Sequence, residues 1–168
     1  MNPSLGPDRP SFESGREGET VILRIRRLNP ERDRDLPFPE YMSPGASGLD
    51  LPAAIETDLV LAPGDIRLIP TGLALAIPLG YEGQVRPRSG LALKHGIGLI
   101  NSPGTIDSDY RGEIGIALIN LGPKPFTLHR GDRIAQLVIN RVYQTAIRLV
   151  EDLDQTERGD GGFGHSGI

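Results

Sequence analysis

Glycine and proline recur along the whole chain and limit the length of any regular element. Together, the 22 glycines and 15 prolines make up more than a fifth of the 168 residues. Glycine weakens helix interiors and proline breaks them, so long helices have few uninterrupted stretches in which to form. The chain nevertheless lacks the low complexity of a disordered protein. This pattern favours a β domain with many turns.

Length and charge narrow the class of protein further. A chain of 168 residues is long enough for one core, because a domain of about 150 residues buries roughly 70% of its unfolded surface. Cysteine is absent, which excludes disulfides and thiolate metal sites and gives no sign of an oxidising compartment. The net charge of -4 disfavours non-specific binding to nucleic acid or to an anionic membrane, and a basic local pocket stays compatible with it. We expect a cytoplasmic protein.

The N-terminal stretch differs from the rest of the chain. Residues 1–20 carry several charges and no apolar run, so they have the character of neither a signal peptide nor a membrane span. We expect three parts: a disordered extension over 1–20, a β domain over 21–150 and a C-terminal arm over 151–168.

Short segments of alternating or β-branched residues recur about every ten residues between turn signals. Strands are predicted at 21–25, 58–61, 66–69, 73–77, 83–86 and 114–118. Such spacing favours a sandwich or jelly roll over βαβ units.

An acidic residue, Asp50, lies between Leu49 and Leu51 in a segment with a β-type period. Two arrangements fit this pattern. In the commoner one, Asp50 faces solvent on a half-buried strand; in the other, it faces a polar site.

Residues 89–96 are the one segment with helical character. Ser89 suits the N-cap and Gly96 suits the left-handed position at the C-terminus. A helix start leaves backbone N–H groups unpaired, so Arg88, Ser89 and Gly90 could bind an anion. An ordinary capped helix beside a surface arginine is the alternative, and it is the commoner of the two.

Asp107 and Tyr110 stand three residues apart in a segment rich in turn formers. A hairpin here would present Asp107 as a general base and Tyr110 as a flat packing surface. The alternative for this segment alone is a polar β-turn without chemistry.

The glycine-rich tail at 158–167 contains Arg158 and Phe163. Its composition predicts a disordered terminus. A flap that closes over a nucleotide would instead stack Phe163 on a base and bring Arg158 to a phosphate.

The segment 133–142 is apolar on both faces apart from Gln136. A strand buried on both sides in an antiparallel protein needs a second covering surface. We expect a neighbouring subunit to supply it.

Five stretches of the chain form an ordered set. They are PGASGLDL at 44–51, RPRSGLA at 86–92, GTIDSDYRGEI at 104–114, RGDRIAQL at 130–137 and the tail at 158–167. In this order they resemble the five motifs of the trimeric dUTP diphosphatase (dUTPase) family. Each motif alone is a weak signal, whereas five in order across most of one domain are a strong one.

The resemblance implies an all-β fold, a jelly roll or distorted β-barrel of the β-clip kind. With the residues already described, we expect this fold to carry one short helix and mobile N- and C-terminal arms, of which the N-terminal one lies outside the family pattern. It implies a homotrimer whose three active sites each combine motifs of more than one subunit, with the tail folding over the ligand. It also implies hydrolysis of dUTP to dUMP and diphosphate, which limits uracil incorporation into DNA and supplies dUMP for dTMP synthesis.

The resemblance further implies roles for individual residues. Asp107 would orient the water that attacks the α-phosphorus, and Tyr110 would pack under the deoxyribose and exclude a ribose 2′-hydroxyl. Mg²⁺ would bind the triphosphate without a direct protein ligand, and Asp50 would act on the metal only through waters bound to it. The residues implied to bind substrate are Arg88, Ser89, Gly90, Asn101, Thr105, Ile106, Asp107, Tyr110, Gln136, Arg158 and Phe163.

Two other functions fit parts of the same pattern. A dCTP deaminase resembles this fold, but deamination needs a carboxylate poised at the base ring. A nucleotide-binding trimer without turnover has no need of Asp107 as a base. The combination of Asp107 with Tyr110 therefore favours the hydrolase.

Overall fold

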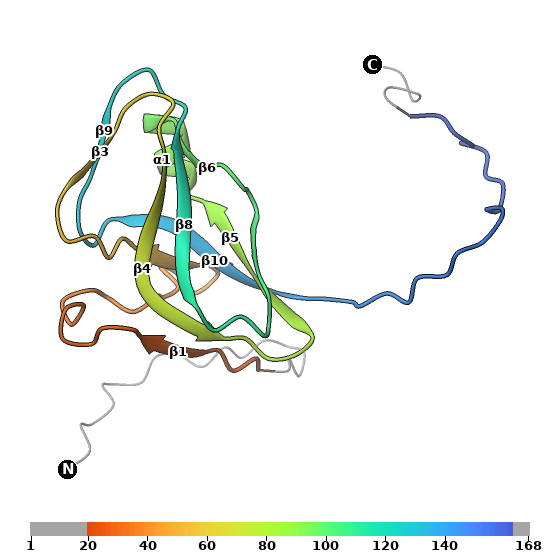
Figure 1. The fold of residues 1–168 in the computed structure, drawn as a ribbon, viewed down its shortest axis with the longest axis horizontal. Helices are drawn as coiled ribbons and strands as arrows, with labels where there is room; N and C mark the ends of the chain where they lie inside the picture. The colour runs from red at the N-terminus through yellow and green to blue at the C-terminus, as the bar shows by residue number, and fades with distance from the viewer. Residues whose placement is uncertain (1–19, 163–168) are drawn as a thin grey trace, which may run out of the picture.

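The computed structural model describes residues 20–162, and most of the regular structure in this range is β-strand (Figure 1). Apart from Thr20, the predicted extension at 1–20 lies outside the described residues, as does Phe163. The strands are β1 (Arg24–Arg27), β2 (Leu49–Pro52), β3 (Leu59–Leu61), β4 (Ile66–Ala76), β5 (Tyr81–Pro87), β6 (Ile97–Leu99), β7 (Gly104–Ile106), β8 (Glu113–Asn120), β9 (Phe126–Leu128) and β10 (Arg133–Arg141), and the helix is α1 (Ser89–His95).

Two four-stranded sheets and one two-stranded sheet form the fold. The first sheet has the order β1-β4-β8-β6 and the second β2-β10-β5-β7, while β3 pairs with β9. All of these pairings are antiparallel, and many join strands that are distant in the sequence. The prediction of an all-β jelly roll with one short helix is confirmed.

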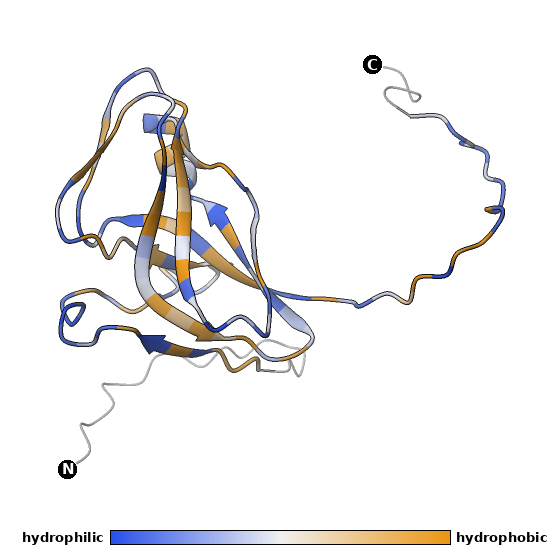
Figure 2. Cartoon of the chain, viewed as in Figure 1, coloured by the Kyte–Doolittle hydropathy of each residue, from blue (hydrophilic) through white to orange (hydrophobic). Residues whose placement is uncertain are grey.

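The hydrophobic core follows the two-residue period of the strands. In β8, Ile114, Ile116 and Leu118 are buried, while the residues between them are exposed or half-buried. They pack in one cluster with buried residues such as Ile69 of β4 and Leu137 of β10. Burying one side chain of this size contributes about 1.5–3 kcal/mol to the free energy of unfolding. The buried residues of several strands together therefore supply the main stabilisation of the fold. Figure 2 shows the hydrophobic residues of β4 and β8 running along both strands.

Strand β4 differs from its prediction. The sequence predicts separate strands at 66–69 and 73–77, whereas the structure has one strand that passes through Pro70 and Gly72. The register against β8 shifts between Pro70 and Ala74, and Gly72 adopts a positive φ of 68°. The Glu113 side chain accepts a hydrogen bond of 2.8 Å from the Gly72 N–H. Because a side chain satisfies this backbone group, the chain bends here without leaving the sheet.

The predicted helix is present, and its C-terminal cap is Gly96 with a φ of 71°, as expected. The prediction of Ser89 as the N-cap is wrong. Arg88 occupies that position, with φ -89° and ψ 124°, and no side chain caps the first turn. The chain leaves β5 at Pro87 in an extended conformation, so Arg88 is the last extended residue and Ser89 is already helical.

Strand β10 has two unlike faces. Ala135 and Leu137 are fully buried in the core, while Gln136, Val138 and Asn140 on the opposite face are half-buried. This second face is less apolar than predicted, because Val138 lies between two amides. The Nδ2 atom of Asn140 is buried without a hydrogen-bond partner among the described residues. A covering surface on this face would therefore need to be partly polar.

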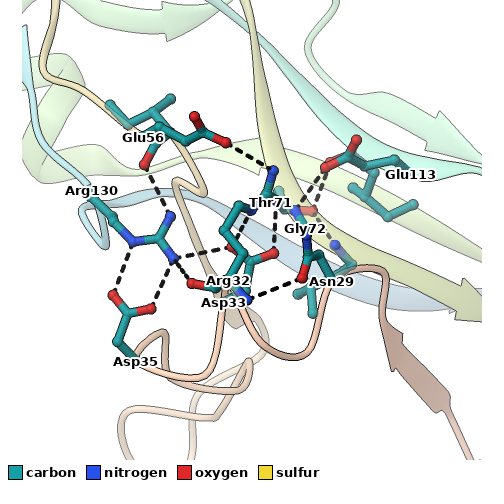
Figure 3. A network of polar contacts seen from close by, with 12 residues as sticks. Asn29, Arg32, Asp33, Asp35, Glu56, Thr71, Gly72, Glu113 and Arg130 are labelled. Atoms are coloured by element: carbon teal, nitrogen blue, oxygen red, sulfur yellow. Dashed lines mark hydrogen bonds and ion pairs between the residues drawn. The ribbon is translucent and has the colours of Figure 1, made fainter.

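An ion-pair network joins the segment after β1 to the turn before β10 (Figure 3). The Arg130 guanidinium donates to both carboxylate oxygens of Asp35, at 2.9 and 2.8 Å, and to Asp33 at 3.1 Å. It also donates to the backbone oxygens of Ile55, at 3.0 Å, and Arg32, at 2.8 Å. Asp33, which is 1% exposed, accepts two further hydrogen bonds from the Arg32 side chain at 2.8 and 2.7 Å.

The network shifts the titration of its carboxyl groups. Hydrogen bonding to Arg130 lowers the pKa of Asp35 to about 2. The pKa of Asp33 is also lowered, first by its hydrogen bonds with Arg32 and then by those with Arg130, against the opposing effect of burial. Both groups are therefore more acidic in the folded protein than in an unfolded chain.

The chain after β10 leaves the body of the domain. Residues 142–162 contain no strand or helix, and Figure 1 shows them running away from the sheets. The arm therefore exposes large apolar side chains, among them Ile147, with a relative exposure of 93%, and Leu149, with a relative exposure of 101%. Among the described residues, no helix is long and apolar enough to cross a membrane.

Candidate active site

A buried carboxylate and two arginines form a polar cluster at the start of α1. The Asp50 cluster consists of Asp50, Arg88, Arg133 and Gln136. Asp50 Oδ2 lies 3.1 Å from Arg133 Nη1 and 3.4 Å from Arg88 Nη2, while Asp50 Oδ1 accepts a hydrogen bond of 3.1 Å from Gln136 Nε2. Sheet order explains the proximity, because Asp50 of β2 lies directly opposite Gln136 of β10, and β10 in turn pairs with β5.

Asp50 is 5% exposed, so the expectation that it faces solvent on a half-buried strand is wrong. The alternative, a polar environment, is what the structure contains. A carboxylate this buried needs compensating partners, and two guanidinium groups and an amide provide them.

Ser89 and Gly90 follow the Asp50 cluster directly. Both are exposed at the start of α1, and an added Cβ at Gly90 would meet no atom within 4 Å. The Asp50 cluster contains two positive charges, on Arg88 and Arg133, and one negative charge, on Asp50. Together with the exposed Ser89 and Gly90, it gives this part of the surface a net positive charge. Such a surface is suited to an anion.

Asp107 and Tyr110 occupy a separate turn. Asp107 follows β7 directly and is exposed, and the turn closes with a hydrogen bond of 3.2 Å from the Tyr110 N–H to the Asp107 carbonyl oxygen. The Tyr110 hydroxyl donates to the Glu113 carbonyl oxygen at 3.0 Å. Gly112 lies against the ring, since an added Cβ would be 2.3 Å from the Tyr110 hydroxyl oxygen. The ring is therefore held in place although it is 46% exposed.

Four of the predicted site residues line one hollow. Thr105, Ile106, Asp107 and Tyr110 surround a volume of about 210 Å³, together with Ile114 and Gly115. Asp107 also borders a second hollow of about 530 Å³, on the side of Tyr81 and Glu82. The Asp107 turn thus borders two hollows.

The two parts of the site lie at opposite ends of β5. Ile106 pairs with Gly83, which places Asp107 beside Glu82, whereas Ser89 follows the other end of the strand. At roughly 3.3 Å per residue, Asp107 and Ser89 are about 20 Å apart. One chain therefore does not bring these two residues to the same small ligand.

The remaining predicted residues lie elsewhere. Asn101 is exposed, and its Nδ2 atom lies 3.1 Å from the place that a Cβ on Gly104 would take. Arg158 is exposed in the arm and donates to the Gly161 carbonyl oxygen at 2.8 Å. Phe163 falls outside the described residues. The structure does not bring Arg158 to either part of the site within one chain.

Arg133 was not predicted as a site residue, although its side chain contacts Asp50 and its carbonyl oxygen accepts a hydrogen bond of 2.8 Å from Arg88 Nη1. A signal was available. Arg133 stands three residues before Gln136 in the same motif, and the intervening register shift against β2 lets both reach Asp50.

Among the residues that the structure describes, no group of three or more histidine, cysteine, aspartate or glutamate side chains could hold a metal ion. A metal enclosed by protein ligands does not fit this site. Mg²⁺ fits if substrate phosphates and waters supply its ligands, which is a common arrangement for this ion.

Known proteins resemble this chain in sequence and in fold. The family model described as dUTPase matches residues 34–167. A deoxyuridine 5'-triphosphate nucleotidohydrolase of Desulfotalea psychrophila is 59% identical over 154 residues, covering 92% of this chain and 93% of the relative. The dUTPase of Staphylococcus bacteriophage 80alpha with dUPNHPP has a TM-score of 0.78 at 28% identity, covering 89% of this chain and all of the phage chain.

A second solved structure concerns a metal. A mutant dUTPase from phage phi11 of S. aureus, described with a structural Mg(II) ion, has a TM-score of 0.68 at 25% identity over 78% of this chain and 97% of the phage chain.

The match of the family model over most of the chain, together with the high identity of the bacterial relative, shows that this chain belongs to the dUTPase family.

Proposed function

We propose that this protein hydrolyses dUTP to dUMP and diphosphate. The observation that carries the proposal is the hollow lined by Thr105, Ile106, Asp107 and Tyr110, which places an exposed carboxylate beside a fixed aromatic ring. The relative from Desulfotalea psychrophila is named a deoxyuridine 5'-triphosphate nucleotidohydrolase, which supports dUTP as the substrate.

In this proposal, Asp107 accepts a hydrogen bond from the attacking water and orients it towards the α-phosphorus. A general base must lie within hydrogen-bond distance of the proton it accepts, which requires a defined carboxylate position. Asp107 has one, because it follows a strand paired with β5 and opens a turn closed by the Tyr110 N–H. Tyr110 provides the surface under the deoxyribose, and its hydrogen bond to Glu113 keeps the ring from turning away.

Arg88, Ser89, Gly90 and Gln136 are proposed to bind the triphosphate. Phosphoryl transfer depends mainly on positioning and on neutralising charge, and an exposed surface with two arginines supplies both. When bound to the triphosphate, Mg²⁺ would neutralise further charge. Arg158 and Phe163 of the tail are proposed to close over the bound nucleotide.

The same geometry supports a homotrimer with shared sites. Asp107 must lie next to the phosphorus that Ser89 helps to hold, yet the two residues of one chain are about 20 Å apart along β5. A second chain would place its Asp107 beside the Ser89 of the first. The exposed apolar side chains of the arm, such as Ile147 and Leu149, would also be covered in such an assembly.

A substrate panel tests the activity. The purified protein with Mg²⁺ should release diphosphate from dUTP and not from dCTP, dTTP or UTP. Ammonia release from dCTP would identify a deaminase, and binding of dUTP without any turnover would identify a non-catalytic protein. The D107N variant should bind dUTP and lose most turnover, while D109N, which alters another exposed carboxylate of the same turn, should retain it. Equal loss of binding in D107N would make Asp107 structural.

Mixing two inactive variants tests the shared site. D107N and R88Q are each expected to be inactive alone. In a shared site, one chain provides Asp107 and another provides Arg88. Such a site is intact when the chain that provides Asp107 is the R88Q variant and the chain that provides Arg88 is the D107N variant. After unfolding and joint refolding at a 1:1 ratio, about a quarter of the sites should meet this condition. Activity that stays at the level of the separate variants would show that each chain builds its own site.

A further inference from the structure

A hollow of about 580 Å³ lies between the end of α1 and the loop that joins β8 to β9. The segment 92–96 forms one wall, and the segment 121–126 forms the other. Neither wall contains a residue of the candidate active site. The volume falls within the range of about 300–1,000 Å³ that is usual for pockets that bind small molecules.

The charge of this hollow is unusual for an acidic protein. The sequence contains only two lysines, and they lie on opposite walls of the hollow: Lys94 in α1 and Lys124 in the loop. No acidic residue is among those that line it. Within residues 20–162, neither ammonium group has a hydrogen bond or an ion pair. Two unpaired cations on opposite walls favour an anion that reaches both.

The buried side chain of Asn120 fixes the wall that carries Lys124. It donates to the carbonyl oxygens of Leu61 and Lys124, both at 2.9 Å, and its Oδ1 accepts a hydrogen bond of 2.9 Å from the Gly122 N–H. A proline on each side of Lys124 restricts the backbone further. The loop is therefore held in one conformation.

The two walls are also joined directly to each other. The Leu121 N–H donates to the Gly96 carbonyl oxygen at 2.8 Å. Gly122 lies so close to α1 that an added Cβ would be 2.2 Å from the His95 carbonyl oxygen. The hollow is thus largely pre-formed, so a ligand would lose little affinity to ordering of the protein backbone.

The hollow further offers aromatic and apolar surface. The ring centroids of His95 and Phe126 are 5.1 Å apart, with an interplanar angle of 54°. Leu93 and Leu121 are exposed beside them. An apolar lining with a few cations suits a ligand that has a flat ring and an anionic group. Two lysines match the charge of a phosphate monoester, about -1.5 to -2, better than that of a single carboxylate.

We propose that this hollow is a second ligand site, which binds an aromatic phosphate of the size of a nucleoside monophosphate. Lys94 and Lys124 bind the phosphate from opposite walls, and the base lies against the rings of His95 and Phe126. The inference is independent of the proposed hydrolysis of dUTP, because no side chain of the candidate active site takes part in it.

Calorimetry with adenosine monophosphate (AMP) tests this site. Saturating dUPNHPP, the ligand of the phage structure, first occupies the candidate active site. AMP should then bind once per chain. Adenosine and inorganic phosphate should each bind at least about tenfold more weakly, since each lacks one half of the interaction. Absence of AMP binding, displacement of AMP by dUPNHPP, or equally tight binding of adenosine or inorganic phosphate would overturn the proposal.

Variants of the two lysines test which side chains bind AMP. K94Q and K124Q should each weaken binding at least about tenfold, whereas K94R and K124R, which keep the charge, should stay close to wild-type. Both lysines are exposed, so these variants should fold. R24Q is the control, because Arg24 is an exposed cation of β1, at the other edge of the first sheet from β6. Unchanged affinity in K94Q or K124Q, or an equal loss in R24Q, would refute the assignment.

The scarcity of lysine allows the position of the ligand to be observed directly. Reductive methylation with isotope-labelled formaldehyde keeps the positive charge and labels only Lys94, Lys124 and the N-terminal amine. In NMR spectra of this protein, AMP should shift both lysine signals. If it shifts only one of them or neither, the ligand does not lie between the two walls and the proposal is wrong.

Discussion

Replacing Arg130 with methionine should destabilise the fold substantially. The variant removes every donor that Arg130 supplies to Asp33, Asp35 and two backbone oxygens, while methionine keeps much of the apolar stem. Asp33 is nearly inaccessible to water but keeps two hydrogen bonds from Arg32, so it is not left as a bare buried charge.

The magnitude follows from what stays unsatisfied. Asp35, whose side chain is 56% exposed, can exchange Arg130 for water and adds little. The loss therefore comes mainly from Asp33 and the Ile55 carbonyl oxygen, each of which loses a hydrogen bond from a charged donor worth about 1.5–3 kcal/mol. Part of this is recovered through Arg32 and relaxation of the turn. We expect a net loss of about 3 kcal/mol in the free energy of unfolding.

Urea unfolding at fixed protein concentration measures this loss. R67M is the matched control, because Arg67 is 51% exposed and pairs with Asp65 at 3.6 Å on the surface. Exposed pairs of this kind contribute about 0–1 kcal/mol. A loss in R130M no larger than that in R67M would refute the reasoning, since the buried part of the network would then contribute nothing beyond a surface ion pair.

Three further predictions concern acid stability, the Tyr110 ring and the tail. The pKa values of Asp33 and Asp35 are lowered in the folded state. The stability that these two carboxylates contribute is therefore complete above the pKa of an unfolded-state aspartate, about 3.9, and is lost as the pH falls towards about 2. Between about pH 4.5 and 2.5, the urea midpoint should fall more steeply in wild-type protein than in R130M. G112A should displace the Tyr110 ring, which lowers both the turnover of dUTP and the preference of the protein for dUTP over UTP, while the free energy of unfolding changes by less than about 1 kcal/mol. In the control G45A, the added Cβ meets no atom within 4 Å, so neither activity nor stability should change. Preserved selectivity in G112A would contradict the role of the ring. Truncation after Glu157 should lower turnover without shifting the melting temperature, and the opposite result would exclude a lid.

The fold was largely predictable because its signals are local. In β8, the buried residues Ile114, Ile116 and Leu118 alternate with Gly115 and Ala117. Gly96 ends the described helix in the left-handed conformation that glycine favours. Strand β4 was predicted less well, because Pro70 and Gly72 are turn signals in most contexts. What keeps the strand in the sheet there is the Glu113 side chain, which is 41 residues from Gly72 and invisible to local pattern.

The surroundings of Asp50 could not be predicted from the residues beside it. Its neighbours Leu49 and Leu51 indicate a strand with one apolar face, and a charged residue on the other face is usually solvated. Arg88 and Arg133 reach it only because β2, β10 and β5 are adjacent in the sheet. Long-range strand order thus decides whether such a residue is solvated or buried.

The Arg130 network is a second case in which neighbouring residues in the sequence did not reveal that a carboxylate is buried. Asp33 and Asp35 lie in the segment 31–35, in which acidic and basic residues alternate. Asp33 is nevertheless buried, because the Arg130 turn folds back over the connector. Alternating acidic and basic residues therefore gave no means of telling a solvated loop from a closed ion-pair network.

The position of β5 explains why the site residues of one chain fall into two groups. The strand continues through Pro87 into Arg88 and α1 at one end, and its pairing with β7 sets Asp107 at the other. Bringing Asp107 to the Ser89 of the same chain would require breaking the three registered pairs between β5 and β7, and with them the burial of Val85 and Ile106 in the core. A loop movement cannot achieve this. We infer that, in the proposed enzyme, assembly is a condition for catalysis, because each chain offers a phosphate-binding group to one neighbour and a general base to another.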